Sequence, residues 1–225
     1  MKPSQKFLPL TAAALLALMA GAASAQSAGS LQVKIGVNQI SPQVESGNLS
    51  APSQPGTKID VKSATAAILT ANYMLTDHLS VEGYVGLPYK HEIVGDGTIA
   101  GVGKIGTVKQ VSPTVFAQYR FLETKSQVRP YVGLGLTYAK FYGEEGSGTL
   151  TALTNPGGTP TRHKVDAAWG LSPQIGTTLL INDKWFVDAS VIKTFLKTTT
   201  HLSTGQSITT KLDPLAFNLS IGYRY

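Results

Sequence analysis

The carboxy-terminal segment 212–225 alternates strictly between apolar side chains and small or polar ones. Its apolar positions are Leu215, Phe217, Leu219, Ile221, Tyr223 and Tyr225. Because successive side chains of a strand point to opposite faces, the pattern predicts a strand with one fully apolar face. An apolar face that finishes on an aromatic residue favours a transmembrane β-barrel over a soluble sandwich. We expect Tyr223 and Tyr225 to enter the interfacial girdle and to serve as an assembly signal for the barrel assembly machinery.

Residues 1–25 have the pattern of a secretory signal peptide. Lys2 and Lys6 precede an apolar run over residues 8–23, and the sequence Ala-Ser-Ala at 23–25 fits a cleavage site. The run is short, rich in alanine and broken by Pro9, which argues against a membrane anchor. We therefore expect residues 26–225 to form an exported β-barrel that is inserted in the bacterial outer membrane.

Composition excludes several classes of function. Without the two leader lysines, the 19 basic residues fall to 17 against 13 acidic ones, a mild net charge of +4. These charges are dispersed, so nothing suggests nucleic-acid binding. Cysteine is absent, which excludes disulfides and thiol chemistry. Low charge, many glycines and alternating apolar residues suit a membrane barrel.

Eight alternating segments are separated by connections of two lengths. The expected long loops are 41–56, 90–103, 143–162 and 198–207, and the expected short turns are 76–78, 123–127 and 182–184. Long and short connections alternate along the chain. This order predicts an eight-stranded antiparallel transmembrane β-barrel with short periplasmic turns and long extracellular loops.

Strand parity predicts which side chains enter the lumen. Near the periplasmic end these are polar or charged and form an expected ionic floor: Lys34, Asn72, Glu82, Arg120, Asp188 and Arg224. Buried charges persist when paired, and we expect Arg120 and Arg224 to share Glu82 and Asp188. One layer higher the inward residues are bulky and apolar: Tyr84, Phe116 and Ile192. The residues thus predict an apolar cup, open outward, above a charged plug; that they merely fill the lumen of a small barrel is an open alternative.

Two prolines interrupt neighbouring strands in the extracellular half. Pro88 and Pro113 each remove a ladder donor, which proline seldom does inside a sheet. One interpretation is a weak lateral seam through which a ligand leaves the lumen into lipid. The other is a strand end or bulge at the barrel rim.

Catalytic and metal-binding patterns are missing from the sequence. The four histidines, His78, His91, His163 and His201, have no ligand spacing, and no GxSxG, HExxH or P-loop pattern occurs. We therefore expect no enzyme activity, no metal and no cofactor.

Several ordered blocks resemble the outer-membrane protein W family, which includes the alkane-uptake barrel AlkL. These blocks are residues 87–93, 111–121, 129–135, 180–185 and 212–225. The last one contains Leu212-Asp-Pro214 and the terminal Gly222-Tyr-Arg-Tyr225. The resemblance implies an eight-stranded outer-membrane barrel that admits small hydrophobic molecules. It also implies a lumen constriction, which local matching places at Tyr84 and Ile192. The long loops do not match, so the identity of the ligand is not carried over.

Two functions compete at this stage. The first is passive uptake of small hydrophobic molecules through a barrel surrounded by outer-membrane lipid and lipopolysaccharide. The second is a non-transporting structural or adhesive barrel, or a receptor for phage or bacteriocin. The apolar layer above the floor favours the first, because a purely structural barrel is expected to carry charge networks through its full height.

Overall fold

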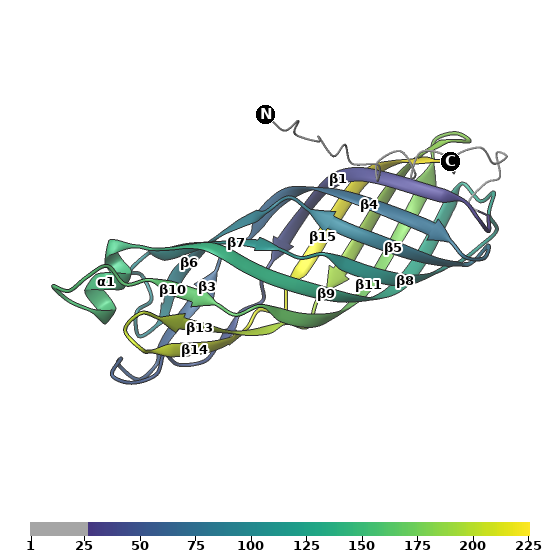
Figure 1. The fold of residues 1–225 in the computed structure, drawn as a ribbon. Helices are drawn as coiled ribbons and strands as arrows, with labels where there is room; N and C mark the ends of the chain where they lie inside the picture. Colours follow the sequence, from purple (N-terminus) through teal and green to yellow (C-terminus); the bar gives the residue numbers. More distant parts are fainter. Residues whose placement is uncertain (1–26) are drawn as a thin grey trace, which may run out of the picture.

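Residues 27–225, the part of the chain that the computed structural model describes, form a long tube of antiparallel strands with one short helix (Figure 1). The expected signal peptide of residues 1–25 lies outside the described residues. The barrel strands are β1 (Leu31–Ser41), β4 (Ala64–Met74), β5 (Leu79–Gly86), β8 (Thr114–Arg120), β9 (Val128–Gly146), β11 (Ala168–Leu180), β12 (Trp185–Lys193) and β15 (Leu215–Arg224). The other elements are β2 (Glu45–Ser46), β3 (Thr57–Val61), β6 (Tyr89–Gly97), β7 (Lys104–Val111), α1 (Gly148–Thr154), β10 (His163–Val165), β13 (Lys197–Leu202) and β14 (Ser207–Lys211).

Eight strands close into a ring in the order β1, β4, β5, β8, β9, β11, β12, β15, and β15 pairs back to β1. Every pairing in the ring is antiparallel, and the closing register places Ile35 opposite Ile221. A closed ring leaves no strand edge, as the hydrocarbon interior of a membrane requires. The predicted fold class, an eight-stranded antiparallel transmembrane β-barrel, is therefore confirmed.

The outer face of the ring carries exposed apolar side chains between two groups of aromatic residues. We call the end of the tube that carries the C-terminus the lower end. The lower group comprises Tyr119, Phe121, Trp185, Tyr223 and Tyr225, and the upper group comprises Tyr138, Trp169 and Phe195. Along β11, Trp169 and Leu179 are about 25 Å apart if each residue rises about 3.3 Å on a strand tilted by ~40°. That height matches the apolar band of about 25 Å found in outer-membrane barrels. In the described part of the chain, no helix has the length and apolar character needed to cross a membrane.

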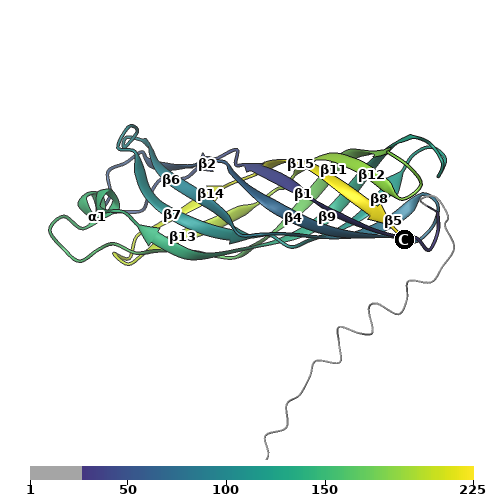
Figure 2. The same cartoon turned by 90° about the horizontal axis from the view of Figure 1, so that it is seen from above.

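The two ends of the tube differ. The connections at 75–78, 121–127 and 181–184 are short and lie at the end that carries the C-terminus. Helix α1 and the hairpins β6–β7 and β13–β14 lie at the opposite end (Figure 2). The expected alternation of short and long connections is thus present, with both kinds segregated by end.

The segments expected as long loops largely continue the tube, which corrects the predicted strand boundaries. Residues 89–111 form the hairpin β6–β7, residues 197–211 form the hairpin β13–β14, and β9 extends to Gly146. In β6, His91 and Ile93 are buried while Lys90 and Glu92 are exposed. The glycine content of this segment suggested a loop, but the alternation of its side chains is that of a strand.

The part of the tube beyond the membrane is formed by β2, β3, β6, β7, α1, β10, β13, β14 and the end of β9, and we call it the extension (Figure 2). Its interior is apolar. Its buried side chains form one cluster: Ile93, Ile105, Val108, Ala139, Phe141, Leu150, Val165, Leu196, Leu202 and Leu212. Leu150 comes from α1, which begins after Ser147; the Ser147 hydroxyl caps the helix by accepting a hydrogen bond from the Leu150 amide at 3.2 Å. A second cluster lies lower in the tube and contains Tyr84, Phe116 and Ile192.

Candidate functional site

The lower lumen is built around one lysine. Lys34 Nζ lies 2.6 Å from Glu82 Oε1 and 3.2 Å from Asp188 Oδ1, and all three side chains are buried. Lys34 stands on β1, which is two strands away from β5 on one side and from β12 on the other. Its long side chain therefore reaches across the lumen to two carboxylates, and its single positive charge holds two negative ones.

Neighbouring residues complete this ionic network. The Tyr131 hydroxyl donates to Asp188 Oδ1 at 3.0 Å, and the Thr178 hydroxyl donates to Asp188 Oδ2 at 2.9 Å. The Arg120 guanidinium donates to Thr178 Oγ1 and to Gln118 Oε1, both at 3.0 Å, and lies over the Tyr131 ring, 4.7 Å from its centroid. Two cations and two anions balance in charge, as a buried network requires.

The expected ion pairs of the two arginines are wrong, because Lys34 takes both carboxylates. Arg224 lies near the chain terminus, where its Nε donates to the Asp183 carbonyl. In the β12–β15 register Asp188 faces Ser220, so Arg224 is four residues, or about 13 Å, farther down. Parity identified inward residues correctly but did not separate these two levels.

Asn72 is buried beside the network without joining it. Its Nδ2 lies 3.4 Å from Gln32 Oε1 and 3.7 Å from Met74 Sδ. Asn72 lies directly opposite Glu82 in the β4–β5 register, whereas Arg224 lies on the periplasmic side, below the four charged groups. The structure assembles Lys34, Glu82, Arg120 and Asp188 as one unit, which we call the ionic floor from here on.

A belt of amides lies directly above the ionic floor, and sequence reasoning did not single it out. Gln118 Nε2 donates to Gln174 Oε1 at 2.9 Å, and Gln174 Nε2 donates to Ser190 Oγ at 3.4 Å. Asn218 Nδ2 donates to the same Ser190 Oγ at 3.1 Å, and Asn38 Nδ2 donates to Asn218 Oδ1. All five side chains occupy inward strand positions, so parity contained the signal that would have found them.

The three residues predicted to constrict the lumen pack together above this belt. Tyr84 and Phe116 meet edge to face with ring centroids 6.4 Å apart, and both share a buried apolar cluster with Ile192. The Tyr84 hydroxyl donates to Asn218 Oδ1 at 2.7 Å, which ties the aromatic layer to the amides below. The lumen therefore changes from polar to apolar within one layer of side chains.

Pro88 and Pro113 occupy breaks on adjacent strands. Pro88 lies between β5 and β6, and Pro113 lies between β7 and β8. Both prolines are exposed on the outer face. Residues 85–88 and 111–113 lie between the β5–β8 ladder and the β6–β7 ladder and do not pair with each other. We call this stretch the seam.

The seam interrupts the hydrogen-bonded ladder. Tyr84 pairs with Thr114 in the β5–β8 register, and pairing resumes with Tyr89 and Gln110 in β6–β7. Five positions separate the pairs on one strand and four on the other, so one extra residue is accommodated here. The seam is thus a bulge between two well-paired stretches, as the second interpretation of the prolines allowed, and it lies at the height of the apolar layer.

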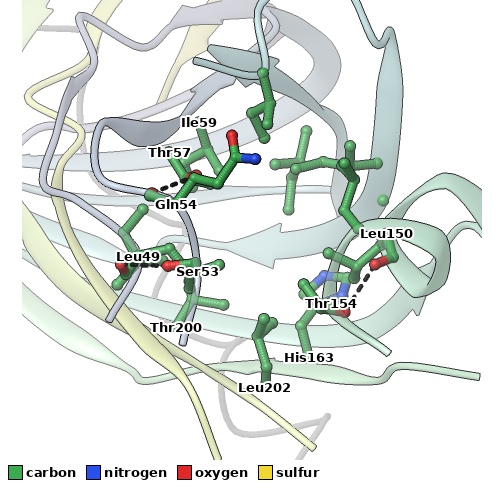
Figure 3. A pocket seen from close by; sticks show the side chains of 16 residues that line it. Leu49, Ser53, Gln54, Thr57, Ile59, Leu150, Thr154, His163, Thr200 and Leu202 are labelled. Atoms are coloured by element: carbon green, nitrogen blue, oxygen red, sulfur yellow. Dashed lines mark hydrogen bonds between the residues drawn. The ribbon is translucent and has the colours of Figure 1, made fainter. Parts of the chain in front are cut away.

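Three cavities follow one another along the upper lumen. The outer cavity, of about 160 Å³, is the largest of the three and mainly apolar (Figure 3). Its apolar lining comprises Leu49, Ile59, Ile93, Ile99, Ile105, Leu150, Leu153, Leu202 and Ile208. The middle cavity is narrow, about 30 Å³, and shares Ile59, Ile93 and Thr200 with the outer one.

The inner cavity, of about 40 Å³, shares Gln110 with the middle cavity. Tyr84 and Ile192 contribute to its lining, as does Ser112 of the seam. The cavities therefore succeed one another from the extracellular end to the level of Tyr84 and Ile192. Sequence reasoning found the last of these levels and missed the outer two, because their lining comes from segments expected as loops.

Two histidines contribute to these cavities. His163 of β10 lines the outer cavity, and in Figure 3 its ring points towards Leu150 and Thr154 of α1. His91 lines the middle cavity and its Nδ1 lies 2.8 Å from the Lys62 carbonyl. Burial lowers the pKa of both rings below the ordinary value, so both are neutral at pH 7.

No group of three His, Asp or Glu side chains within residues 27–225 could hold a metal ion. The chemistry that the lumen offers is binding: an apolar surface above, hydrogen-bonding amides in the middle and a charge-balanced network below. An apolar solute can occupy the first region, whereas it cannot replace the partners of the buried charges in the last.

Comparison with known proteins gives one consistent result. The sequence model of the OmpW family matches residues 27–225. Outer membrane protein W of Vibrio cholerae is 33% identical over 219 residues, covering 95% of this chain and 96% of that protein. The dibenzothiophene metabolism operon protein PahQ of Pseudomonas aeruginosa is 26% identical over 174 residues, 76% of each chain. The crystal structure of OprG from Pseudomonas aeruginosa has a TM-score of 0.80 at 25% identity, covering 90% of this chain and 99% of that one.

Proposed function

The chain belongs to the OmpW family of outer-membrane β-barrels, and from this premise we propose that it is a passive channel for small hydrophobic molecules. The observation that carries the proposal is the succession of three cavities ending at Tyr84 and Ile192. The name of PahQ, a protein of a dibenzothiophene metabolism operon, supports it, because dibenzothiophene is an aromatic and apolar molecule. We propose no enzymatic activity.

Capture begins at the outer cavity. Each methylene that leaves water gains about 0.8 kcal/mol, so a chain of eight carbons is drawn strongly into an apolar cavity. The cavity lies at the end of the tube farthest from the membrane, where α1 contributes Leu150 and Leu153 to its lining (Figure 2). A hydrophobic solute can therefore leave the aqueous side without first crossing the polar surface of the lipopolysaccharide layer.

The ionic floor blocks an axial route for such a solute. Its four side chains come from β1, β5, β8 and β12, and their partners Tyr131 and Thr178 come from β9 and β11. Breaking a buried pair without replacing it costs about 3–5 kcal/mol, and an apolar molecule supplies no replacement. The barrier is therefore one of chemistry as well as of size.

Because the ionic floor blocks the axial route, the proposed exit is lateral, through the seam. The inner cavity touches the seam from the lumen through Ser112, while Leu87 of the seam is exposed on the lipid side. Pro88 has no N–H, so widening this stretch sacrifices few ladder hydrogen bonds. We propose that the solute passes between residues 85–88 and 111–113 into the outer leaflet.

The partners of the barrel follow from its outer surface. The lipid of the outer membrane surrounds the apolar band, and we propose lipopolysaccharide as the neighbour above it. Lys90 and Lys109 face each other directly across β6 and β7, and both are exposed. Like charges in that position are destabilising unless an anion lies between them, and the phosphates of lipopolysaccharide fit. The barrel assembly machinery remains an expected partner during insertion.

The test is uptake of n-octane by cells that consume it, compared with cells that lack the barrel and scaled to the amount of folded barrel. Tyr84→Trp, which narrows the constriction, and Ile192→Asp, which charges it, should each slow uptake several-fold. Leu171→Trp is a matched control, because Leu171 is exposed on the lipid face. Unchanged uptake in both constriction variants would remove the channel and leave a structural barrel.

The route is tested separately with Arg120→Ala, which opens the ionic floor. A lateral exit predicts that this change leaves octane uptake per folded barrel as it was. Faster uptake would retain the channel and replace the lateral route with an axial one.

A further inference from the structure

Several buried polar atoms in the upper lumen lack partners. Among residues 27–225 these include both ring nitrogens of His163, Nε2 of His91 and the hydroxyl of Thr210. Native proteins satisfy nearly all buried polar groups, and an unsatisfied one costs about 1–3 kcal/mol. Three such residues along one apolar passage therefore call for a ligand that completes them.

His163 is the first of these residues along the passage from the extracellular end. Its side chain is 93% buried, since 7% of its surface is exposed, and it lines the outer cavity among leucines and isoleucines. The Thr107 backbone lies nearby without reaching good hydrogen-bond geometry with either ring nitrogen. The ring is thus free to donate or accept one hydrogen bond inside the cavity.

His91 and Thr210 come next along the passage. Both line the middle cavity, and His91 is 99% buried. The contact of His91 Nδ1 with the Lys62 carbonyl fixes the proton on Nδ1 and leaves Nε2 as an acceptor. The Gln110 side chain lies near this ring without reaching good hydrogen-bond geometry with Nε2. An acceptor nitrogen and a hydroxyl beside the same apolar cavity match a small group that donates one hydrogen bond and accepts another.

We propose that the channel selects hydrophobic molecules that carry one neutral hydrogen-bonding head, such as a medium-chain alcohol or a phenol. The inference rests on the proposed function and names its substrate class. The head binds His163 in the outer cavity and then His91 and Thr210 in the middle cavity, while the tail fills the apolar lining. A pure alkane uses the same passage but leaves these polar atoms unsatisfied.

The surroundings favour a neutral head over a carboxylate. Burial lowers the pKa of both histidines, so neither ring carries a charge at pH 7 that could pair with an anion. The Glu144 carboxylate also acts on His163 and would repel a second negative charge. A buried hydroxyl, by contrast, needs only the hydrogen bonds that these residues offer.

The experiment uses the full barrel in lipid nanodiscs with ¹⁵N-labelled histidine, and 1-octanol, n-octane and octanoate as probes. The chain has only four histidines, so each imidazole can be followed separately. We expect 1-octanol to shift the ring signals of His163 and His91. His201, which is exposed and paired with Asp166 at 3.1 Å, should stay unchanged. Equal shifts with n-octane, stronger shifts with octanoate or no shift with any probe would overturn the proposal.

Uptake measurements separate this inference from the channel itself. His163→Phe should reduce barrel-dependent uptake of 1-octanol several-fold while uptake of n-octane stays the same or rises, and His163→Gln should restore most of the alcohol uptake. Barrel-dependent octane uptake with no preference for the alcohol would end the inference and leave the channel standing. Octanol that shifts both rings while neither probe depends on the barrel for uptake would end the channel and leave the binding site.

Discussion

The lower and upper halves of the tube are opposite in polarity. In the membrane half, leucines, isoleucines and aromatics face outward, and the lumen holds Lys34, Glu82, Arg120 and Asp188. In the extension, lysines and glutamates face outward and the lumen is lined by an apolar cluster. The same β-sheet architecture thus buries charge where its surroundings are lipid and buries apolar surface where its surroundings are water.

The difference shows how one alternating pattern serves two solvents. A strand fixes only that neighbouring residues point to opposite sides, and the solvent decides which side is apolar. Where the inversion occurs, at the level of Tyr84 and Ile192, the lumen passes from cavities to packed polar groups. The candidate channel ends at that inversion.

The strongest way to break this comparison is to unbalance the ionic floor. Lys34→Met leaves Glu82 and Asp188 without their cation, and we expect a loss of about 3–5 kcal/mol in the free energy of unfolding. Urea unfolding in detergent, followed by tryptophan fluorescence, measures this loss. Lys211→Met is the matched control, because Lys211 pairs with Glu45 at 2.8 Å on the exposed outer surface and should contribute nothing measurable. If the two variants lost equal stability, the floor would have no special role.

A smaller effect is expected from the lower aromatic girdle. Tyr225→Ala removes a ring that packs on Tyr223 with centroids 4.9 Å apart, and we expect several-fold slower assembly into the outer membrane. Heat-modifiable gel mobility measures the folded fraction. Tyr142→Ala, which removes a partly exposed tyrosine from the extension, should assemble like the parent. Normal assembly of the Tyr225 variant would contradict its use as a signal.

The smallest effect concerns acidification of the upper half. The unfolded imidazole has a pKa of about 6.5, and burial holds the folded pKa of His91 and His163 lower. Below about pH 6.5 the unfolded state therefore binds more protons, and stability falls as the pH falls. Hydrogen-exchange protection, corrected for the intrinsic exchange rate at each pH, should fall between pH 7 and pH 5 more in β6 and β10 than in β1. His91→Phe with His163→Phe should abolish the difference, and an unchanged difference would assign it to other groups.

Much of the membrane half could be predicted from the sequence. Alternation in each strand predicts which residues face the lumen, and the predicted residues Lys34, Glu82, Arg120 and Asp188, like Tyr84, Phe116 and Ile192, are buried there. The ion pairs were not predictable in the same way, because parity gives the face of a strand but not its stagger against its neighbours. Lys34 reaches both carboxylates only because β1 closes the ring between β4 and β15.

The extension was missed for a different reason. Its strands contain glycine and threonine and are bounded by turns, so segments such as 89–111 suggested loops. Their inward side chains are apolar and their outward ones charged, which is the reverse of the lower barrel. A search for alternation regardless of which phase is apolar would have detected β6 and, with it, His91 and Ile93 of the middle cavity.

The central claim is that hydrophobic molecules occupy the upper lumen, stop at the constriction and leave through the seam. Photo-crosslinking with an alkane that carries a diazirine, followed by peptide mass spectrometry, tests it directly. We expect adducts on residues of the three cavities, such as Ile93 and Ile192, and on Leu87 of the seam. Adducts on Phe186 or Met74, which are fully buried in the lower barrel, would show passage through the ionic floor and would contradict the lateral route.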